Sequence, residues 1–403
     1  MAASLETLQR AHQKQQEQNI KLPPWWKIRR ELIRPLRQLG GLINSISTLL
    51  LGSWYFDTFL ARGLIRTEGN GPITEKVAIY VIYAPTGLCE SHIRSVEYIT
   101  SRGYGVVVVS NAQLSEVSKQ KLKTLCKEII ERPNFGYDFG AYRQGVLSLE
   151  SQLNHLNYLL LINDSTWFPI LGHDWIQQAE SQRKDFVGAA SNYGISRVIP
   201  GSIRDFEFNY HSRHKNFHYC SFALLVGKKV FTHPAFFAFW KRFPLTNVKN
   251  RTVRRGEIGL SKLIIKRGFT HCETLDIPNL NIFLKGLSRQ ELALTLEHMI
   301  IPEEFFLKGI RERVFREALT LPASESDDLF RSFILVVVSR IGISYALPYL
   351  NILLKGSMFL KKSPLWLDQE SRNKTLDFVE SISSNSDESY VLSEAKFLGG
   401  RLA

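Results

Sequence analysis

Short apolar runs alternate with amphipathic stretches between residues 77 and 162. Val77–Tyr83, Tyr104–Ser110 and Tyr158–Ile162 are rich in β-branched and aromatic side chains, which predicts buried strands. Residues 129–132 are a candidate for a short further strand. The stretches with helical spacing of apolar residues are 91–102, 114–128 and 138–153. Strands that alternate with helices predict right-handed βαβ units, and therefore an α/β fold with a mostly parallel sheet flanked by helices.

The same alternation predicts where ligands bind, because open parallel sheets bind their ligands beyond the carboxyl ends of the strands. In this chain those positions follow Tyr83, Ser110, Arg132 and Ile162. Candidate chemistry is therefore expected just after these four residues.

A different pattern precedes the first strand. Two tryptophans and five basic residues lead into Gln38–Phe56, which carries no charge and places apolar residues on one helical face. Such a segment is predicted to be an amphipathic helix lying on an anionic membrane surface. A helix packed on the globular core is the alternative, and both interpretations stay open.

The C-terminal third is predicted to be helical. Phe333–Leu354 is strongly apolar but is interrupted by Arg340 and Pro348, which favours a second interfacial segment or a buried helical pair over a membrane span. Residues 381–403 are rich in Ser and Gly and are predicted to form a flexible tail. The expected organisation is a helical segment at 1–70, an α/β domain at 71–285, a helical region at 286–380 and the tail at 381–403.

Composition narrows the class of partner. The 403 residues include 51 Lys and Arg against 38 Asp and Glu, and the net charge of +13 favours anionic partners. The four cysteines form no CxxC pair, which argues against a zinc ribbon and indicates a reducing compartment. Residues 2–21 lack the apolar core of a signal peptide. No RNP, KH or zinc-finger pattern occurs, so no nucleic acid is expected, although a basic nucleic-acid-binding protein stays an alternative.

Several common catalytic motifs do not occur in the chain. The missing motifs are GxxxxGK[ST], a GxGxxG that follows a strand, HExxH and GxSxG. The sequence therefore gives no support for a P-loop protein, a dinucleotide-binding protein, a zincin or an α/β-hydrolase.

One candidate site follows the predicted strand that ends at Ile162. There the chain continues Asn163-Asp164-Ser165. A carboxylate in this position can hold Mg²⁺ or Mn²⁺ against a diphosphate, because hard cations prefer carboxylate and phosphate oxygens. Asn163 and Ser165 can assist through neutral oxygens. The alternative is that Asp164 caps the next turn.

A second candidate lies between Arg132 and Gly140. Gly136 and Gly140, flanked by Asn134 and Asp138, open the predicted helix at 138–153. Such a turn exposes backbone N–H groups that suit a phosphate or a sugar hydroxyl. The alternative is a plain helix start, in which Asp138 is the N-cap and the glycines are turn residues.

Together these pieces resemble the rhamnan synthesis F family of bacterial polysaccharide glycosyltransferases. The matching segments are NFGYDFGAYRQG at 134–145, LLLINDSTWFP at 159–169, DFVGAASN at 185–192, HYCSFALLVGKKVF at 218–231 and GEIGLSKLIIKRGF at 256–269. The resemblance covers about residues 77–275. It implies a GT-A-like, Rossmann-type nucleotide-sugar fold and transfer of a deoxysugar such as rhamnose in O-antigen or capsule assembly.

The resemblance also implies roles for the candidate residues. The donor's base or ribose is expected near Tyr83, Ala84, Pro85 and Thr86, and its sugar and diphosphate near Arg132, Asn134, Gly136, Asp138, Gly140, Asn163 and Ser165. Asp164 is expected to face the diphosphate and its Mg²⁺ or Mn²⁺. His218 and Ser221 are expected near the acceptor or the transferred sugar.

An inverting transferase also needs a group that takes the acceptor's hydroxyl proton. Glu257 follows a basic stretch and precedes an apolar helix, so we expect it to be presented at a helix start as this base. Its alternative role is charge complementarity at a helix N-terminus, and Asp205 and Glu207 are rival candidates. The basic stretch at 241–255 is expected either to bind diphosphate or a lipid-diphosphate acceptor or to be a solvated basic face, and both interpretations stay open.

The sequence thus predicts a glycosyltransferase on the cytoplasmic face of the bacterial plasma membrane. It would move a sugar from a nucleotide-sugar donor to a lipid-linked glycan acceptor. The single carboxylate in Asn163-Asp164-Ser165 leaves one further alternative, a catalytically inactive family member that serves as a membrane scaffold.

Overall fold

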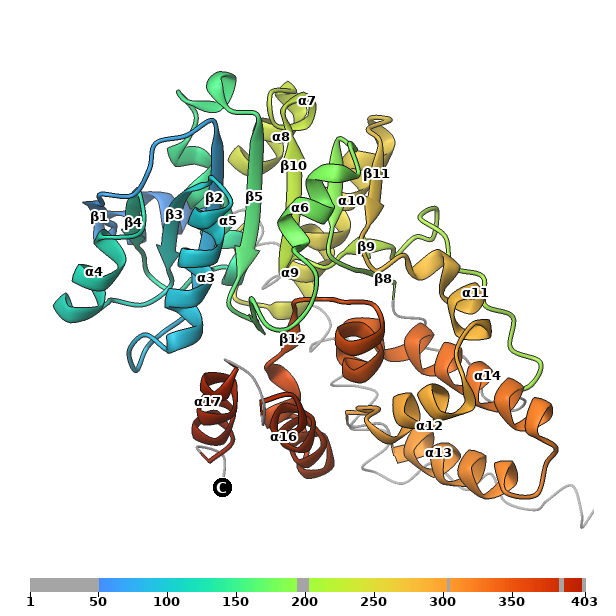
Figure 1. Cartoon of the computed structure of the whole chain (residues 1–403). Coiled ribbons are helices and arrows are strands. Elements are labelled where there is room, and N and C mark those ends of the chain that lie inside the picture. The colour runs from blue at the N-terminus through green and yellow to red at the C-terminus, as the bar shows by residue number, and fades with distance from the viewer. Residues whose placement is uncertain (1–50, 194–202, 303–304, 384–387, 401–403) are drawn as a thin grey trace, which may run out of the picture. The chain divides into compact units, whose positions relative to one another are not determined.

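An eight-stranded sheet is the centre of the fold (Figure 1). Its strand order is β1-β4-β3-β2-β5-β10-β7-β11. The strands from β4 to β5 pair in parallel, β1 and β10 run antiparallel to their neighbours, and β7 pairs in parallel with β11. The bounds are β1 Ile65–Glu68, β2 Lys76–Ile82, β3 Gly105–Ser110, β4 Glu128–Glu131, β5 Tyr158–Asn163, β7 Phe186–Gly188, β10 Ala223–Gly227 and β11 His271–Glu273.

The structure is a computed structural model that describes residues 51–193, 203–302, 305–383 and 388–400. Most of the predicted amphipathic helix at Gln38–Phe56 lies outside these residues. The unit that begins at Gly52 contains the sheet and all of the helices named below.

The central strands form because their side chains are apolar on both faces. Residues 77–82 of β2 and all of β3 are buried, as expected for strands covered by helices on either side. Ile79 lies under Gly145 of helix α5, whereas the neighbouring Tyr80 contacts Ser95 of helix α3. Successive side chains of a strand point to opposite faces, so α3 (Glu90–Ser101) and α5 (Tyr137–Ser148) cover opposite faces of the sheet.

The remaining helices extend this covering layer and build the C-terminal region (Figure 1). The α-helices are α4 Glu116–Lys123, α6 Trp175–Ser181, α7 Lys228–Phe231, α8 Pro234–Lys241, α9 Lys249–Arg255, α10 Glu257–Lys266, α11 Leu280–Lys285, α12 Arg289–Glu297, α13 Phe305–Ala318, α14 Ala323–Ile341, α15 Ile343–Ala346, α16 Gln369–Ser383 and α17 Ser389–Gly400. Short 3₁₀ turns lie at Leu60–Gly63, Leu153–His155, Ile277–Asn279 and Ser363–Trp366, and a π-helical turn at Leu350–Leu354.

The strand order identifies the fold class. Four parallel strands in the order β4-β3-β2-β5, followed by the antiparallel β10 and then β7, are the arrangement of the GT-A-like, Rossmann-type fold. The predicted α/β fold with a mostly parallel sheet is therefore confirmed. The carboxyl ends of β2, β4 and β5 lie at one edge of this sheet, where ligands bind in open α/β folds.

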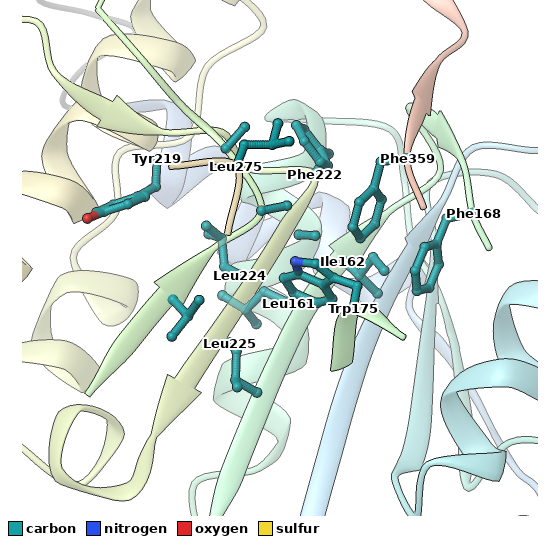
Figure 2. Close-up of a cluster of buried hydrophobic side chains, with 14 of the residues drawn as sticks. Leu161, Ile162, Phe168, Trp175, Tyr219, Phe222, Leu224, Leu225, Leu275 and Phe359 are labelled. Carbon is teal, nitrogen blue, oxygen red and sulfur yellow. The ribbon is translucent and has the colours of Figure 1, made fainter. Parts of the chain in front are cut away.

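The C-terminal region returns to this edge. Strand β12 (Leu360–Lys361) pairs antiparallel with β6 (Thr166–Trp167), which directly follows the turn at the end of β5. Just before β12, Phe359 stacks on Phe168 with the ring centroids 4.5 Å apart, and it also packs against Phe222 and Trp175 (Figure 2). A second two-stranded pair is formed by β8 (Ser191–Asn192) and β9 (His218–Tyr219), which run antiparallel.

Two expectations for the C-terminal third can be compared with the structure. Within Phe333–Leu354, α14 buries Phe333, Ile334 and Val336, so this part is packed in the protein core. The flexible tail predicted from residue 381 is wrong for residues 389–400, which form α17 and pack against α16. The apolar Val391 and Ala395 of α17 are buried, and their burial outweighs the low helix propensity of the Ser and Gly residues.

Among the described helices, none combines the length and the apolar character that crossing a bilayer requires.

Candidate active site

The turn after β5 holds the carboxylate of Asp164 in a fixed position. Its Oδ2 accepts a hydrogen bond from the N–H of Tyr83, at 2.7 Å, and lies 3.2 Å from Nε2 of His92. The N–H of Cys89 donates to Nδ1 of His92, so the ring proton sits on Nε2 and is donated to Asp164. Strand β2 and helix α3 therefore supply the groups that orient this carboxylate.

The environment keeps Asp164 ionised. Burial alone would raise the pKa of its carboxyl, but the hydrogen bond from His92, the charge of Lys362 and the N–H of Tyr83 together lower the pKa below its ordinary value. Asp164 is thus a fixed negative charge at the carboxyl edge of the sheet.

Asn163 links this turn to the other candidate residues. Its Nδ2 donates to Oδ2 of Asp138, at 3.1 Å, and to the carbonyl of Ser221, at 3.3 Å. Its Oδ1 accepts from the N–H of Ser165. One buried amide therefore holds together the end of β5, the first turn of α5 and the segment before β10.

The surroundings of Asp138 shift its pKa in the opposite direction to that of Asp164. Burial and the negative charges of Asp164 and Glu257 raise the pKa of Asp138 to about 7, although Lys361 and Lys249 oppose the rise. Asp138 therefore takes up or releases its proton near neutral pH.

The glycine turn, residues 134–140, has a backbone conformation that only glycine permits at Gly136 and Gly140. Gly136 is the N-cap of α5 with φ +86°, and its N–H donates to Oδ1 of Asn247 at 2.9 Å. A Cβ on Gly140 would stand 2.4 Å from the carbonyl oxygen of Phe135 and 3.1 Å from the guanidinium of Arg132. The two glycines thus let the chain pass close to its own backbone.

Arg132 lies beneath this turn. Its side chain is buried, donates to Oδ1 of Asn111 and to the carbonyl of Phe135, and its guanidinium lies 4.7 Å from the centre of the Phe56 ring. The side chain of Arg132 therefore bonds to groups of the protein inside the turn. Among the residues predicted to bind the nucleotide sugar at this turn, Asn134 is exposed.

Three residues predicted for the acceptor side meet at one point. Oε1 of Glu257, the first residue of α10, accepts from the N–H of Ser221 at 3.0 Å and from its Oγ at 2.6 Å. Oε2 of Glu257 lies 3.6 Å from Nε2 of His218. Since Nδ1 of His218 contacts the carbonyl of Asn216, which can only accept, the Nδ1 proton is fixed and Nε2 faces Glu257.

The other candidates lie around these groups. Tyr83, Pro85 and Thr86 are exposed after β2, whereas Ala84 is buried. The rival bases, Asp205 and Glu207, are exposed in the loop before β9. The residues that the structure brings together through hydrogen bonds are Tyr83, Asp138, Asn163, Asp164, Ser165, Ser221 and Glu257, with His218 in contact.

Four residues of this region were not predicted. His92 lies in the first turn of α3, the helix that follows Tyr83, so extending the search beyond the strand end could have found it. Asn247, Lys361 and Glu394 carry no local signal, because they come from segments distant in the sequence.

A buried network couples α17 to the acidic turn, Asn163-Asp164-Ser165, that follows β5. Glu394 accepts from the N–H of Ser91, from the Oγ of Ser91 and from Nε1 of Trp167, at 2.7–3.0 Å. Lys362, also buried, donates to the Oγ of Ser91 at 3.3 Å. Since Ser91 precedes His92, this network fixes the start of the helix that orients Asp164.

The groups around Asp164 do not match a protein-built site for Mg²⁺ or Mn²⁺. Its Oδ2 is occupied by two hydrogen-bond donors, the Oγ of Ser165 accepts from the ammonium of Lys361 at 3.1 Å, and Lys362 adds a second positive charge. Such cationic neighbours repel a metal ion. Among the described residues, no group of three or more His, Cys, Asp and Glu side chains is arranged to hold a metal. The expected cation at Asp164 stays a prediction.

Fold and site together define the class: a GT-A-like α/β protein with carboxylates at the carboxyl edge of its sheet. The family model for rhamnan synthesis protein F (RgpF) matches residues 106–305. This match confirms, for that part of the chain, the family that the sequence motifs indicated, and together with the fold it supports a glycosyltransferase.

A curated relative and two solved structures are also similar. The "uncharacterized protein y4gN" of Sinorhizobium fredii (strain NBRC 101917 / NGR234) is 34% identical over 243 residues, which are 59% of this chain and 59% of that protein. The chain thus spans about three-fifths of the curated relative that it matches.

Among solved structures, core-mannan synthase A (CmsA/Ktr4) from Aspergillus fumigatus in its Mn/GDP form has a TM-score of 0.29 and 9% identity over 51% of this chain and 74% of its own. The mannosyltransferase Ktr4p from S. cerevisiae in complex with GDP has a TM-score of 0.23 and 9% identity over 44% and 64%. The fold class rests on the strand order given above.

Proposed function

We propose that this protein is a glycosyltransferase that moves a sugar from a nucleotide-sugar donor to an acceptor hydroxyl. The observation that carries the proposal is the set of carboxylates at the carboxyl edge of the sheet. Asp138, Asp164 and Glu257 come from three separate elements, and Asn163 and Ser221 join the groups into one polar network. A buried network with this much charge is costly to maintain, which favours a functional role.

The donor half of the site would be formed by the ends of β2, β4 and β5. Tyr83 and Thr86, which are exposed after β2, would lie beside the base or ribose, and Asn134, exposed before the start of α5, would face the sugar. Asp164 would face the diphosphate side, held there by His92.

The acceptor half would be formed by Glu257 and its neighbours. In the reaction the acceptor oxygen forms a bond to the anomeric carbon, and the bond from that carbon to the diphosphate oxygen breaks. The nucleoside diphosphate leaves with the bonding electron pair, and Glu257 takes the acceptor's hydroxyl proton. Ser221 engages Oε1, which leaves Oε2 facing His218 as the basic atom.

The substrates can be proposed in more detail than the class of enzyme. We propose rhamnose or another deoxysugar as the transferred group, since the matching family is described by rhamnan synthesis. The proposed acceptor is a lipid-linked glycan at the cytoplasmic face of a bacterial plasma membrane, consistent with the net charge of +13. Residues 1–70, and those parts of 286–380 that are exposed rather than buried in the core, would provide the contact with the membrane surface.

The test is a transfer assay with the purified full chain, a panel of nucleotide sugars and a lipid-linked glycan acceptor. Glu257→Gln should lower kcat by about 10²–10⁴-fold if it removes a general base. Glu150→Gln makes the same change at an exposed carboxylate after α5 and is the matched control, with kcat unchanged. Turnover by Glu257→Gln at the wild-type rate would refute the assigned base.

A second outcome addresses the scaffold alternative. If the wild type binds a nucleotide sugar in a thermal-shift assay yet transfers it to no acceptor in the panel, an inactive family member is favoured. If neither binding nor transfer is seen and DNA or RNA binds with steep salt dependence, the nucleic-acid alternative is favoured instead.

A further inference from the structure

Lys361 is brought to the carboxyl edge of the sheet by a segment far from it in sequence. In β12, Lys361 pairs with Thr166 and Leu360 with Trp167. The N–H of Lys362 also donates to the carbonyl of Ser165, at 3.1 Å. The backbone around Lys361 is therefore bonded directly to the residues that follow Asp164.

The side chain of Lys361 reaches into the acidic region. Its Nζ donates to the Oγ of Ser165 at 3.1 Å, and it lies 4.4 Å from the centre of the Phe222 ring. Its charge lowers the pKa of Asp138, which shows that it acts on the carboxylate at the start of α5 as well. One half-buried lysine thus stands between the acidic turn and the glycine turn.

Aromatic packing holds this lysine in place. Phe359, two residues earlier, stacks on Phe168 with an angle of 5° between the ring planes, and packs at 5.2 Å against Phe222 (Figure 2). Phe222 in turn supports the side chain of Lys361. A positive charge that is already in position needs little reorganisation when a negative group arrives.

The neighbouring lysine is used differently. Lys362 is only 6% exposed, lies over the Trp167 ring and donates to Ser91 within the Glu394 network. Lys362 is therefore an internal counter-charge, whereas Lys361 is half-buried and its Nζ donates to the neutral Oγ of Ser165.

We propose that Lys361 binds the diphosphate of the donor and stabilises the negative charge of the departing nucleoside diphosphate, in the role that a protein-held divalent cation would otherwise fill. The inference rests on the proposed function and deepens it. An ammonium group forms short, charge-assisted hydrogen bonds to phosphate oxygens. The ligand class is a nucleoside diphosphate, and its binding is expected to persist without a divalent cation.

The experiment measures binding of UDP, GDP and dTDP to the full chain by isothermal titration calorimetry, in EDTA and in Mg²⁺. Whichever nucleotide binds the wild type should do so with a Kd that changes less than about threefold between the two buffers. Lys361→Met should raise that Kd by about 10- to 100-fold, because it removes a charged hydrogen-bond partner. Lys361→Arg should keep the Kd close to that of the wild type.

Lys355→Met is the matched control. Lys355 also belongs to the C-terminal region and also lies over an aromatic ring, 4.1 Å from the centre of Phe283. Its removal should leave nucleotide binding unchanged. Binding of the matching nucleoside, which lacks phosphate, should be equal in wild type and Lys361→Met, which separates a lost phosphate contact from a disturbed fold.

The outcomes separate the two levels of the proposal. If a nucleotide binds the wild type only with Mg²⁺, or binds Lys361→Met as tightly as the wild type, the role of Lys361 is wrong and the transferase remains. If none of the three nucleotides binds the wild type in either buffer, the proposed function fails, and the role of Lys361 fails with it.

Discussion

The glycine turn and the acidic turn both carry Asn and Asp after a strand of the sheet, but they differ in how their polar groups are used. In the glycine turn, the N–H of Gly136 and the guanidinium of Arg132 are bonded within the protein. In the acidic turn, Asp164 is oriented by two donors and carries a negative charge. The first turn sets a shape and the second presents a charge, so polar residues beside a strand end do not by themselves distinguish the two uses.

The largest effect is expected at the acidic turn. Asp164→Asn removes the negative charge but keeps a side chain that His92 and Tyr83 can still orient. We expect kcat for sugar transfer to fall by about 10²–10³-fold, as for loss of one pre-organised electrostatic group. Circular dichroism should show an unchanged fold. If Asp164→Asn kept the wild-type kcat, the acidic turn would not differ from the glycine turn in presenting a charge that the reaction uses.

A substitution in the glycine turn should lower the stability of the protein. Gly140→Ala places a Cβ 2.4 Å from the carbonyl oxygen of Phe135, so the turn must shift. We expect the free energy of unfolding to drop by about 1–3 kcal/mol, measured by urea denaturation. Gly309→Ala is the control: a Cβ there meets no atom within 4 Å, and alanine should stabilise α13. Equal effects of the two changes would contradict the tight approach.

The third prediction concerns the raised pKa of Asp138, in contrast to the lowered pKa of Asp164. Its pKa is about 7 in the folded protein and ordinary in the unfolded chain, so the folded state binds the proton more tightly. The stability of the wild type should therefore be greatest below about pH 4 with respect to this group, fall as the pH rises, and level off above about pH 7. Asp138→Asn should remove this loss.

The measurement is Tm against pH for both proteins. Above pH 7 the Asp138→Asn variant should be more stable than the wild type, by about 1–2 kcal/mol if part of the charge is screened by solvent. The difference should shrink at pH 5. A difference independent of pH would show that the carboxyl of Asp138 is ionised throughout, like that of Asp164.

The smallest effect is expected at Asn247. Asn247→Ala removes the acceptor of the Gly136 N–H, and a single neutral hydrogen bond contributes about 1 kcal/mol. We expect a small loss of stability and an unchanged kcat. If kcat fell as far as in Asp164→Asn, the glycine turn would have to be assigned a direct part in the chemistry.

Local patterns predicted the sheet well. The runs at Val77–Tyr83 and Tyr158–Ile162 became β2 and β5 within a residue at each end, because a continuous apolar run suits a strand that is buried on both faces. Glu257 was expected at a helix start and is the first residue of α10. These features depend on neighbours in sequence, so the sequence displays them directly.

Features that depend on distant partners could not be predicted in this way. Lys361 and Glu394 reach the candidate site only because β12 pairs with β6 and α17 buries one apolar face. No periodicity near residue 361 or 394 signals those partners. The assigned roles of Asp164, Glu257 and the donor-side residues remain predictions for the same reason, since the sequence motif gives their type but not their ligand.

Glu394 sets an order of events during synthesis of the chain. A ribosome makes β2, α3 and β5 early, yet Ser91 and Trp167 bond to a carboxylate that is translated hundreds of residues later. Until residue 394 has emerged, the start of α3 lacks its acceptor, and His92 is not yet fixed against Asp164. The nascent protein would therefore form its sheet before the carboxyl edge of that sheet is fixed, and a premature stop codon in α17 would leave a folded sheet with that edge loosened.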